Sequence, residues 1–305
     1  MSEAESIRAT PKAVEPSLLR SSPKGVDQVT GPVAHHAEGP VWSDQWGGLR
    51  WVDMLAGDIL SLLPGGMVER RHVGAIAAAL RPRRGGGAVI GVERGFIVED
   101  GSGSLSEVAE AWTDPDIRMN DGGCDPDGRF YCGSMAYDRH VGGGALYRFD
   151  PDRSVHRVLT DVTISNGIEW SPDGSRAYYN DTASYQVDVF DYDSETGLTN
   201  RRPFAKVSPD DGRPDGLTVD ADGGVWVALN LGGSVRRYAA SGTLDDIIEL
   251  PTKSVTACTF GGLNLDELFI TTSRENLKIG EDPFAGSIFR AQPGVTGLPA
   301  REFWG

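Results

Sequence analysis

The sequence predicts an all-β protein, a six-bladed β-propeller with about four antiparallel strands per blade around a central channel. Three observations predict this fold. Short runs rich in Val, Tyr, Trp and Phe lie between clusters of Gly, Asp and Asn, as strands lie between turns. One phrase recurs along the chain: a polar residue, a short apolar run, an Asp-Gly-like turn and a second β-rich run. The copies follow one another at a nearly constant step, as repeated structural units do.

Four copies of the phrase are clear and two are weaker. The clear copies occupy residues 38–53, 120–133, 166–181 and 215–228, and the weaker copies occupy residues 85–98 and 260–271. Their turns fall near positions 45, 86, 127, 173, 222 and 264, so the steps are about 41, 41, 46, 49 and 42 residues. Steps of this size match one four-stranded propeller blade. A β-sandwich or a pair of β domains would also contain Asp-Gly turns, but neither requires such even spacing.

Within each copy, the turn joins two strands and the run that follows adds another. The turn closes a hairpin between its two flanking runs. Residues 145–150 and 186–192 provide third strands after two of the clear copies. We therefore expect one propeller domain over residues 31–305. A polar arm, residues 1–30, precedes it and either packs along the side of the propeller or completes an outer strand.

The composition argues against several classes of function. The chain has 305 residues, with 29 Lys and Arg against 44 Asp and Glu, and a formal net charge of −15. Such an acidic chain is repelled by nucleic acids and by anionic membranes. It contains no apolar run long enough to span a bilayer, no signal-peptide core in the first thirty residues and only three cysteines. We expect a cytoplasmic protein; nothing in the pattern indicates its oligomeric state.

The repeat also predicts a ring of polar side chains. Asn120, Asn166 and Asp215 each lie seven residues before the turn aspartate of their copy, and Glu38 takes this place in the first copy. The sixth copy has Thr256 there, whereas the second copy aligns too loosely to assign a residue. Because the innermost strands of a propeller line its channel, equivalent positions form a ring at one mouth of the channel.

This ring favours a divalent cation. Two carboxylates and two amides that converge on one point repel one another unless a cation lies between them. Their oxygen atoms suit Ca²⁺, Mg²⁺ or Mn²⁺ better than soft metals. The competing interpretation is that the Glu-Gly, Asn-Gly and Asp-Gly pairs only bend the chain where it enters each inner strand.

Several linked segments resemble the SMP-30/gluconolactonase/regucalcin family. The segments are residues 37–42 (AEGPVW), 118–122 (RMNDG) with 125–128 (DPDG), 165–174 (SNGIEWSPDG) and 213–216 (RPDG). The resemblance implies a six-bladed propeller that binds a divalent metal ion and hydrolyses sugar lactones such as gluconolactone. It implies Glu38, Asn166 and Asp215 as metal ligands, and Arg118 and Asn120 as substrate-binding residues. The loop at residues 137–144 lies where family members carry a variable loop over the site.

The chemistry of lactone hydrolysis gives these residues roles. A hard divalent ion polarises the carbonyl and lowers the pKa of a bound water. Our hypothesis is that Asp215 both holds the ion and acts as general base, while Arg118 and Asn120 orient the substrate. Calcium is the first expectation for the ion, and Mg²⁺, Mn²⁺ or Zn²⁺ would also suit the site. The expected partner is a small lactone or ester.

Two other functions remain open from the sequence. The same scaffold and ion could hydrolyse phosphotriesters or aryl esters, because chemistry on one fold varies with its loops. A non-catalytic calcium-binding regulatory protein is the other alternative. Serine-esterase chemistry has no support, because no Gly-x-Ser-x-Gly segment is present.

Other residues receive structural interpretations. We expect Cys124 and Cys132 to be buried small side chains across one hairpin. His35 and His36 should point to opposite faces of a strand, which argues against joint zinc binding. The Arg83-Arg84 pair is interpreted as a solvated loop rather than a site for an acidic substrate. The turn aspartates Asp125, Asp127, Asp173 and Asp222 receive no catalytic role.

Overall fold

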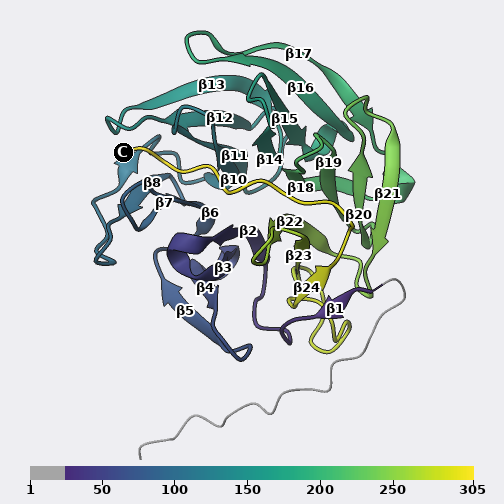
Figure 1. The fold of residues 1–305 in the computed structure, drawn as a ribbon. Coiled ribbons are helices and arrows are strands. Elements are labelled where there is room, and N and C mark those ends of the chain that lie inside the picture. Colours follow the sequence, from purple (N-terminus) through teal and green to yellow (C-terminus); the bar gives the residue numbers. More distant parts are fainter. Residues whose placement is uncertain (1–24) are drawn as a thin grey trace, which may run out of the picture.

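Six four-stranded antiparallel sheets surround one axis in the computed structural model, which describes residues 25–305 (Figure 1). The predicted six-bladed β-propeller is therefore confirmed. Five of the sheets are built from four strands that follow one another in the chain, so each of these blades is a meander of hairpins. The sequence predicts this arrangement because each copy of the phrase supplies one hairpin and the next run supplies a further strand.

The strands have the following bounds. Blade 1 contains β2 (Ala37–Ser43), β3 (Gly48–Asp53), β4 (Asp58–Leu62) and β5 (Val68–His72), and blade 2 contains β6 (Ala77–Pro82), β7 (Ala88–Val92), β8 (Gly95–Glu99) and β9 (Ala109–Glu110). Blade 3 contains β10 (Ile117–Cys124), β11 (Phe130–Ala136), β12 (Gly144–Phe149) and β13 (Val155–Val162), and blade 4 contains β14 (Ser165–Trp170), β15 (Arg176–Asp181), β16 (Gln186–Asp193) and β17 (Gly197–Lys206). Blade 5 contains β18 (Arg213–Val219), β19 (Val225–Asn230), β20 (Ser234–Tyr238) and β21 (Leu244–Glu249). The short 3-10 turns are η1 (Asp44–Trp46), η2 (Met54–Ala56), η3 (Thr182–Ser184) and η4 (Pro209–Asp211).

Blade 6 closes the ring with strands from both ends of the described chain. Its strands β22 (Val255–Gly261), β23 (Glu267–Thr272) and β24 (Ile288–Ala291) are followed, at the outer edge, by β1 (Asp27–Gln28). In β1, Asp27 pairs with Arg290. Of the two arrangements considered for the arm, residues 27–28 therefore complete an outer strand. Residues 1–24 of the predicted arm lie outside the described residues.

Every innermost strand breaks its register at an equivalent place. The breaks follow or enclose the ring positions, which are Glu38, Ala78, Asn120, Asn166, Asp215 and Thr256. A bulge bends a strand and redirects a side chain, and bulges are common beside functional sites. The bulges also identify Ala78 as the residue of the second copy, which the sequence alignment left open. The polar ring is therefore interrupted by an apolar side chain in blade 2.

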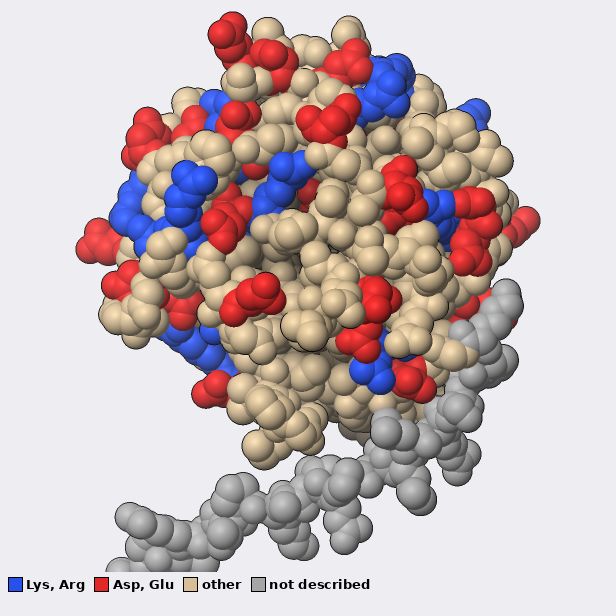
Figure 2. All heavy atoms as spheres, viewed as in Figure 1, with Lys and Arg blue, Asp and Glu red and all other residues tan. Residues whose placement is uncertain are grey.

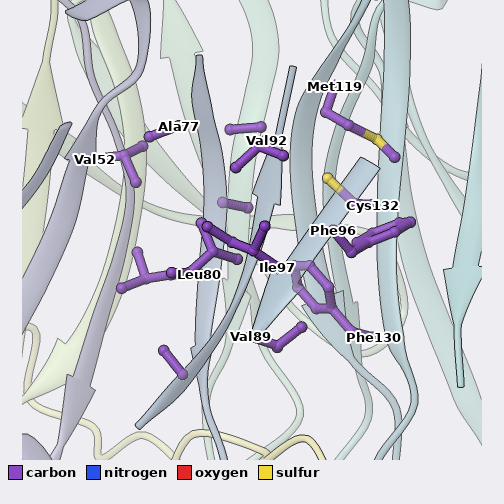
Figure 3. Packing of buried hydrophobic residues seen from close by; sticks show 14 of the residues in the cluster. Val52, Ala77, Leu80, Val89, Val92, Phe96, Ile97, Met119, Phe130 and Cys132 are labelled. Carbon is purple, nitrogen blue, oxygen red and sulfur yellow. The ribbon is translucent and has the colours of Figure 1, made fainter. Parts of the chain in front are cut away.

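Apolar side chains of neighbouring blades pack together between the sheets. The largest cluster joins blades 1, 2 and 3 and includes Val52, Leu80, Phe96 and Phe130 (Figure 3). Phe96 stacks on Phe149 of blade 3 with ring centroids 4.8 Å apart. Cys124 and Cys132 are buried at the same interface, consistent with their predicted role as small core side chains. These contacts hold the inner strands at fixed positions around the channel.

A C-terminal strap, residues 292–305, crosses the ring at the end where the hairpin turns lie (Figure 1). Its backbone hydrogen bonds reach four blades: Ala221 N to Thr296 O, Gly297 N to Leu265 O, Phe303 N to Pro82 O and Trp304 N to Gly128 O. Arg84 lies over the Trp304 ring, 4.3 Å from its centroid, and Arg83 Nε donates to the Gly305 carbonyl. The arginine pair therefore helps to hold the strap. Figure 2, in the same view, shows acidic and basic side chains interspersed over this face.

Among the described residues, the molecule has no helix with the length and apolar character needed to cross a membrane.

Candidate functional site

All five residues singled out in the sequence line one cavity of about 280 Å³ at the other mouth of the channel. They come from four blades: Glu38 from β2, Arg118 and Asn120 from β10, Asn166 from β14 and Asp215 from β18. Each lies near the start of an innermost strand, where the bulge occurs. Residues up to 177 positions apart (215 − 38) thus meet because the repeat places them on one ring.

The two carboxyl groups of the ring are buried without a basic partner. Glu38 is 2% exposed and Asp215 is 4% exposed, and neither forms a salt bridge with Lys or Arg among the described residues. Burial, followed by the charge of Asp215, raises the pKa of Glu38 well above its ordinary range. Burial likewise raises the pKa of Asp215 to about 8. Asp121, adjacent to Asn120, is a further buried acid, and burial raises its pKa to about 6.

Hydrogen bonds fix the orientation of both amide side chains. Arg118 Nη1 donates to Asn120 Oδ1 at 2.7 Å, and Asn120 Nδ2 donates to Asn166 Oδ1 at 3.1 Å and to the Ser165 carbonyl at 2.7 Å. Asn166 Nδ2 in turn donates to Thr182 Oγ1 at 2.7 Å. The carboxamide oxygen of Asn166 accepts one hydrogen bond, from Asn120, so it retains a lone pair, and Asn166 lines the cavity.

Arg118 is a buried cation at the edge of the ring. Its exposed fraction is 6%, and its Nη1 atom contacts Asn120, the Met119 carbonyl at 3.0 Å and the Met54 sulfur at 3.1 Å. Its Nε and Nη2 atoms donate no hydrogen bond to residues 25–305. The guanidinium lines the cavity and therefore retains donor capacity for a bound molecule.

A histidine–serine pair also lines the cavity, and sequence reasoning gave it no role. His36 Nδ1 and Ser273 Oγ are 2.6 Å apart, and His36 Nε2 lies 3.8 Å from Glu38 Oε1. Burial, followed by the charge of Arg118, lowers the pKa of His36 to about 3, so the imidazole is neutral. His35 is exposed and His36 is buried, so the two side chains do point apart, although both lie just before β2 and not within a strand as predicted. His36 lies two positions before Glu38, a spacing that could have indicated that it shares the side of Glu38, whereas its partner Ser273 lies in blade 6 and no local pattern points to it.

The donor set fits a hard divalent cation. Because Glu38 and Asp215 are buried, ionising either carboxyl group costs free energy. A cation between the two carboxylates would offset that cost. Among residues 25–305, no group of three His, Cys, Asp or Glu side chains is arranged to hold a metal ion. An ion on the ring would therefore use the Asn166 carboxamide oxygen beside the two carboxylates, an all-oxygen set that suits calcium.

Two loops from opposite blades meet over the cavity. One is the predicted variable loop between β11 and β12, which carries Arg139, and the other follows β23 and carries Glu275. Arg139 Nη2 lies 3.1 Å from Glu275 Oε1, and both residues line the cavity. Blades 3 and 6 are diametrically opposed in a ring of six, so this ion pair spans the mouth. The sequence gave no signal for the pairing because loop contacts do not follow the repeat.

The turn aspartates lie at the opposite end of the channel from this cavity. Asp125 Oδ1 accepts from the backbone amides of Asp127 and Arg129, and Asp173 accepts from Ser171 and Ser175. These carboxylates close their own turns, as expected for turn formers. None of the four predicted turn aspartates lines the cavity of the ring.

Fold and site together define a six-bladed propeller with an oxygen-rich ring and a buried arginine at one mouth of its channel. Residues 36–274 match the model of the SMP-30/gluconolactonase/LRE-like region, and the chain belongs to this family. It is 36% identical to regucalcin of Danio rerio over 280 residues. This alignment covers 88% of this chain and 94% of that protein. It is likewise 36% identical over 279 residues to human regucalcin, covering 86% and 90%.

Solved structures with the same fold agree with this assignment. A calcium-binding regucalcin from Agrobacterium tumefaciens superposes with a TM-score of 0.85 and 27% identity, covering 92% of this chain and 97% of that one. A gluconolactonase from Xanthomonas campestris superposes with a TM-score of 0.72 at 23% identity, covering 87% and 88%, a likeness that shows the fold alone.

Proposed function

We propose that this chain is a metal-dependent lactonase that hydrolyses a sugar lactone such as gluconolactone. One observation carries the proposal: two buried carboxyl groups and two oriented amides converge in one cavity, beside an arginine with donor capacity left over. The chain also belongs to a family whose description includes gluconolactonase, which supports the proposal. A lactone is an ester, so its hydrolysis requires an electrophile at the carbonyl oxygen and a base for the attacking water.

In the proposed site, Glu38, Asn166 and Asp215 hold the ion, with calcium as the first expectation. When bound, a hard divalent cation polarises a carbonyl and acidifies water. Asn230 Nδ2 donates to Asp215 Oδ2 at 2.9 Å, which holds the carboxyl group in place and leaves its other oxygen to accept a proton. Asp215 thereby serves as general base.

Arg118 and Asn120 bind and orient the substrate in this proposal. Arg118 is held by Asn120 and by the Met119 carbonyl, so its remaining N–H groups point from a fixed position at hydroxyl or carbonyl oxygens of the lactone. The Asn120 amide nitrogen donates to the Ser165 carbonyl and to Asn166, so this side chain is also held in a fixed position for contact with the substrate. Fixed donors avoid the entropy loss of ordering flexible side chains in the reaction.

The test is proton release by the chelator-treated protein on five- and six-membered sugar lactones, with Ca²⁺, Mg²⁺, Mn²⁺ and Zn²⁺ added singly. We expect turnover that returns with metal and is abolished, to less than about a thousandth, in Asp215→Ala. Asp222→Ala, a turn residue at the far end of the channel, is the matched control and should retain turnover. Near-normal activity of Asp215→Ala would overturn the assignment of the base.

A second candidate is a calcium-binding protein without catalysis. It is favoured by the 36% identity to proteins named regucalcin and by the calcium-binding relative of known structure. Tight calcium binding with no turnover on lactones, phosphotriesters or aryl esters would support it. Turnover on phosphotriesters but not on lactones would assign the same ring to the other hydrolase class.

A further inference from the structure

The cavity is much less acidic than the rest of the molecule. Its lining includes three arginines and three acids: Arg118, Arg139, Arg213, Glu38, Asp215 and Glu275. These charges cancel (3 − 3 = 0), and an ion of charge +2 on the ring would leave the lining at +2. The whole chain, by contrast, has a net charge of −15. A positively charged cleft in an acidic protein concentrates anionic molecules at that one place.

Of the three arginines in the lining, Arg139 is the one that forms an ion pair within residues 25–305, and this pair is accessible to water. Its side chain is 46% exposed, and that of its partner Glu275 is 27% exposed. An ion pair with this much water around it is weakly bound and exchanges readily with a competing anion. Because both residues of the pair line the cavity, a ligand bound there lies near them.

Arg139, Arg118 and Glu275 line the same cavity. The central carbon of the Arg118 guanidinium lies 6.0 Å from the centroid of the Tyr137 ring, and Tyr137 begins the loop that carries Arg139. Among residues 25–305, Glu275 is the only acidic partner of Arg139 within 4 Å and Arg118 has none, so a carboxylate that displaces Glu275 would find two guanidinium groups in the cavity lining. A planar carboxylate suits such a place, because guanidinium groups bind carboxylates through paired hydrogen bonds.

We propose that the substrate is an acidic lactone, a sugar lactone that carries a free carboxylate, and that Arg139 binds this carboxylate in exchange for Glu275. This inference rests on the proposed lactonase function and specifies its substrate class. Arg139 is thus a specificity-determining residue, and Glu275 is an internal competitor for the same guanidinium. The lactone itself is still opened beside Glu38, Asn166 and Asp215.

The experiment compares two probes with the metal-loaded full chain. D-Glucaro-1,4-lactone carries a carboxylate, and D-galactono-1,4-lactone has the same ring size without one. The quantity measured is the ratio of kcat/KM for the acidic probe to kcat/KM for the neutral probe. For the unmodified protein we expect a ratio above about ten, the effect of one charged hydrogen-bonded pair.

The two partners of the ion pair should act in opposite directions. Arg139→Met should lower the ratio about tenfold, and Arg139→Lys should restore part of it. Glu275→Gln should raise the ratio, because the competing carboxylate is gone. An ion pair that only fixes the loops would move the ratio in the same direction in both variants, so this sign difference separates the two roles. Arg153→Gln, on an exposed turn of blade 3, is the control and should leave the ratio unchanged.

The possible failures are distinguishable. If the protein hydrolyses neither probe with any of the four ions, the lactonase function and this inference both fail. If it hydrolyses the neutral lactone at least as well and the ratio is the same in Arg139→Met, the substrate class is wrong while the lactonase function stands. Circular dichroism of each variant shows whether it is folded. If Arg139→Met does not fold, Arg139→Lys still tests the proposal.

Discussion

At the scale of single residues, burial controls the charge of the ring. Glu38 and Asp215 are almost fully buried, and the charge of Asp215 makes ionisation of Glu38 more costly. A cation changes this balance, because it lowers the energy of both ionised groups at once. Ionised without a cation, these side chains are unfavourable for folding; as the ligands of the proposed site they would couple ion binding to stability.

This coupling predicts a pH dependence for the ion-free protein. The pKa of Asp215 is raised from 3.8 to about 8, so between these values the unfolded chain releases the proton and the folded chain keeps it. The free energy of unfolding should therefore fall as pH rises from about 4 to about 8. Asp215→Asn removes this loss and should stabilise the ion-free protein by a few kcal/mol at pH 8.5, because each pKa unit corresponds to about 1.4 kcal/mol. The stabilisation should be smaller at pH 5.

Urea unfolding at the two pH values measures this effect. Glu38→Gln is a suitable companion, because burial also raises the pKa of that carboxyl group. Equal destabilisation by Asp215→Asn at both pH values would contradict the prediction and would mean that Asn230 needs the carboxylate for its hydrogen bond.

At the scale of elements, the inner strands approach one another so closely that some positions accept only glycine. A Cβ atom added at Gly167 of β14 would lie 2.5 Å from the backbone nitrogen of Leu217 in β18. The residue before it is Asn166, so the close contact sets the position of a ring side chain. The Asn-Gly pair is thus both a bend and a ring element, and the two interpretations of the sequence are compatible.

Gly167→Ala should therefore destabilise the protein by about 2 kcal/mol, the usual cost of overpacking a dense interior. Because β14 would have to move away from β18, metal affinity should fall as well. Gly31→Ala is the control: its Cβ would meet no atom within 4 Å, and we expect a change within about 0.5 kcal/mol. Urea unfolding and calcium titration measure the two effects; an unchanged stability of Gly167→Ala would show that the blades can separate at no cost.

The repeat made the inner strands and their ring predictable, because equivalent residues of a propeller share a height in the channel. Glu38, Asn166 and Asp215 were found in this way, and the structure places them in one cavity. Ala78 was not, since the second copy lacks a polar marker. The Arg139–Glu275 contact joins loops 136 residues apart, and no local pattern encodes such a pairing. Side chains on strands follow the repeat, whereas those on loops depend on the assembled ring.

At the scale of the whole molecule, the circle of six blades is closed twice, by β1 at the edge of blade 6 and by the C-terminal strap across the turn face. Phe303 of the strap is fully buried and stacks on Phe149 of blade 3, with ring centroids 5.3 Å apart. Its backbone nitrogen donates to the Pro82 carbonyl of blade 2 at 2.8 Å. The strap therefore ties the last blade to blades on the other side of the ring.

Phe303→Ala should cost about 3–5 kcal/mol, the range for removing a fully buried aromatic side chain. Trp304→Ala is the matched comparison: this neighbour is 44% exposed, and its removal should cost about 1 kcal/mol. Chemical unfolding of both variants tests the difference. Equal effects of the two substitutions would mean that the strap is not anchored by Phe303.

The double closure has a consequence for the synthesis of the chain. Gln28 and Ser287 hydrogen bond across 259 positions, and the strap over the turn face is made of residues 292–305, which follow all six blades in the chain. During translation the early blades can form as they emerge, but the first of them has no neighbour on one side until blade 6 leaves the ribosome. An incomplete propeller exposes apolar inter-blade surface for that whole interval, so nascent chains of this protein are candidates for chaperone binding until blade 6 has packed against blade 1.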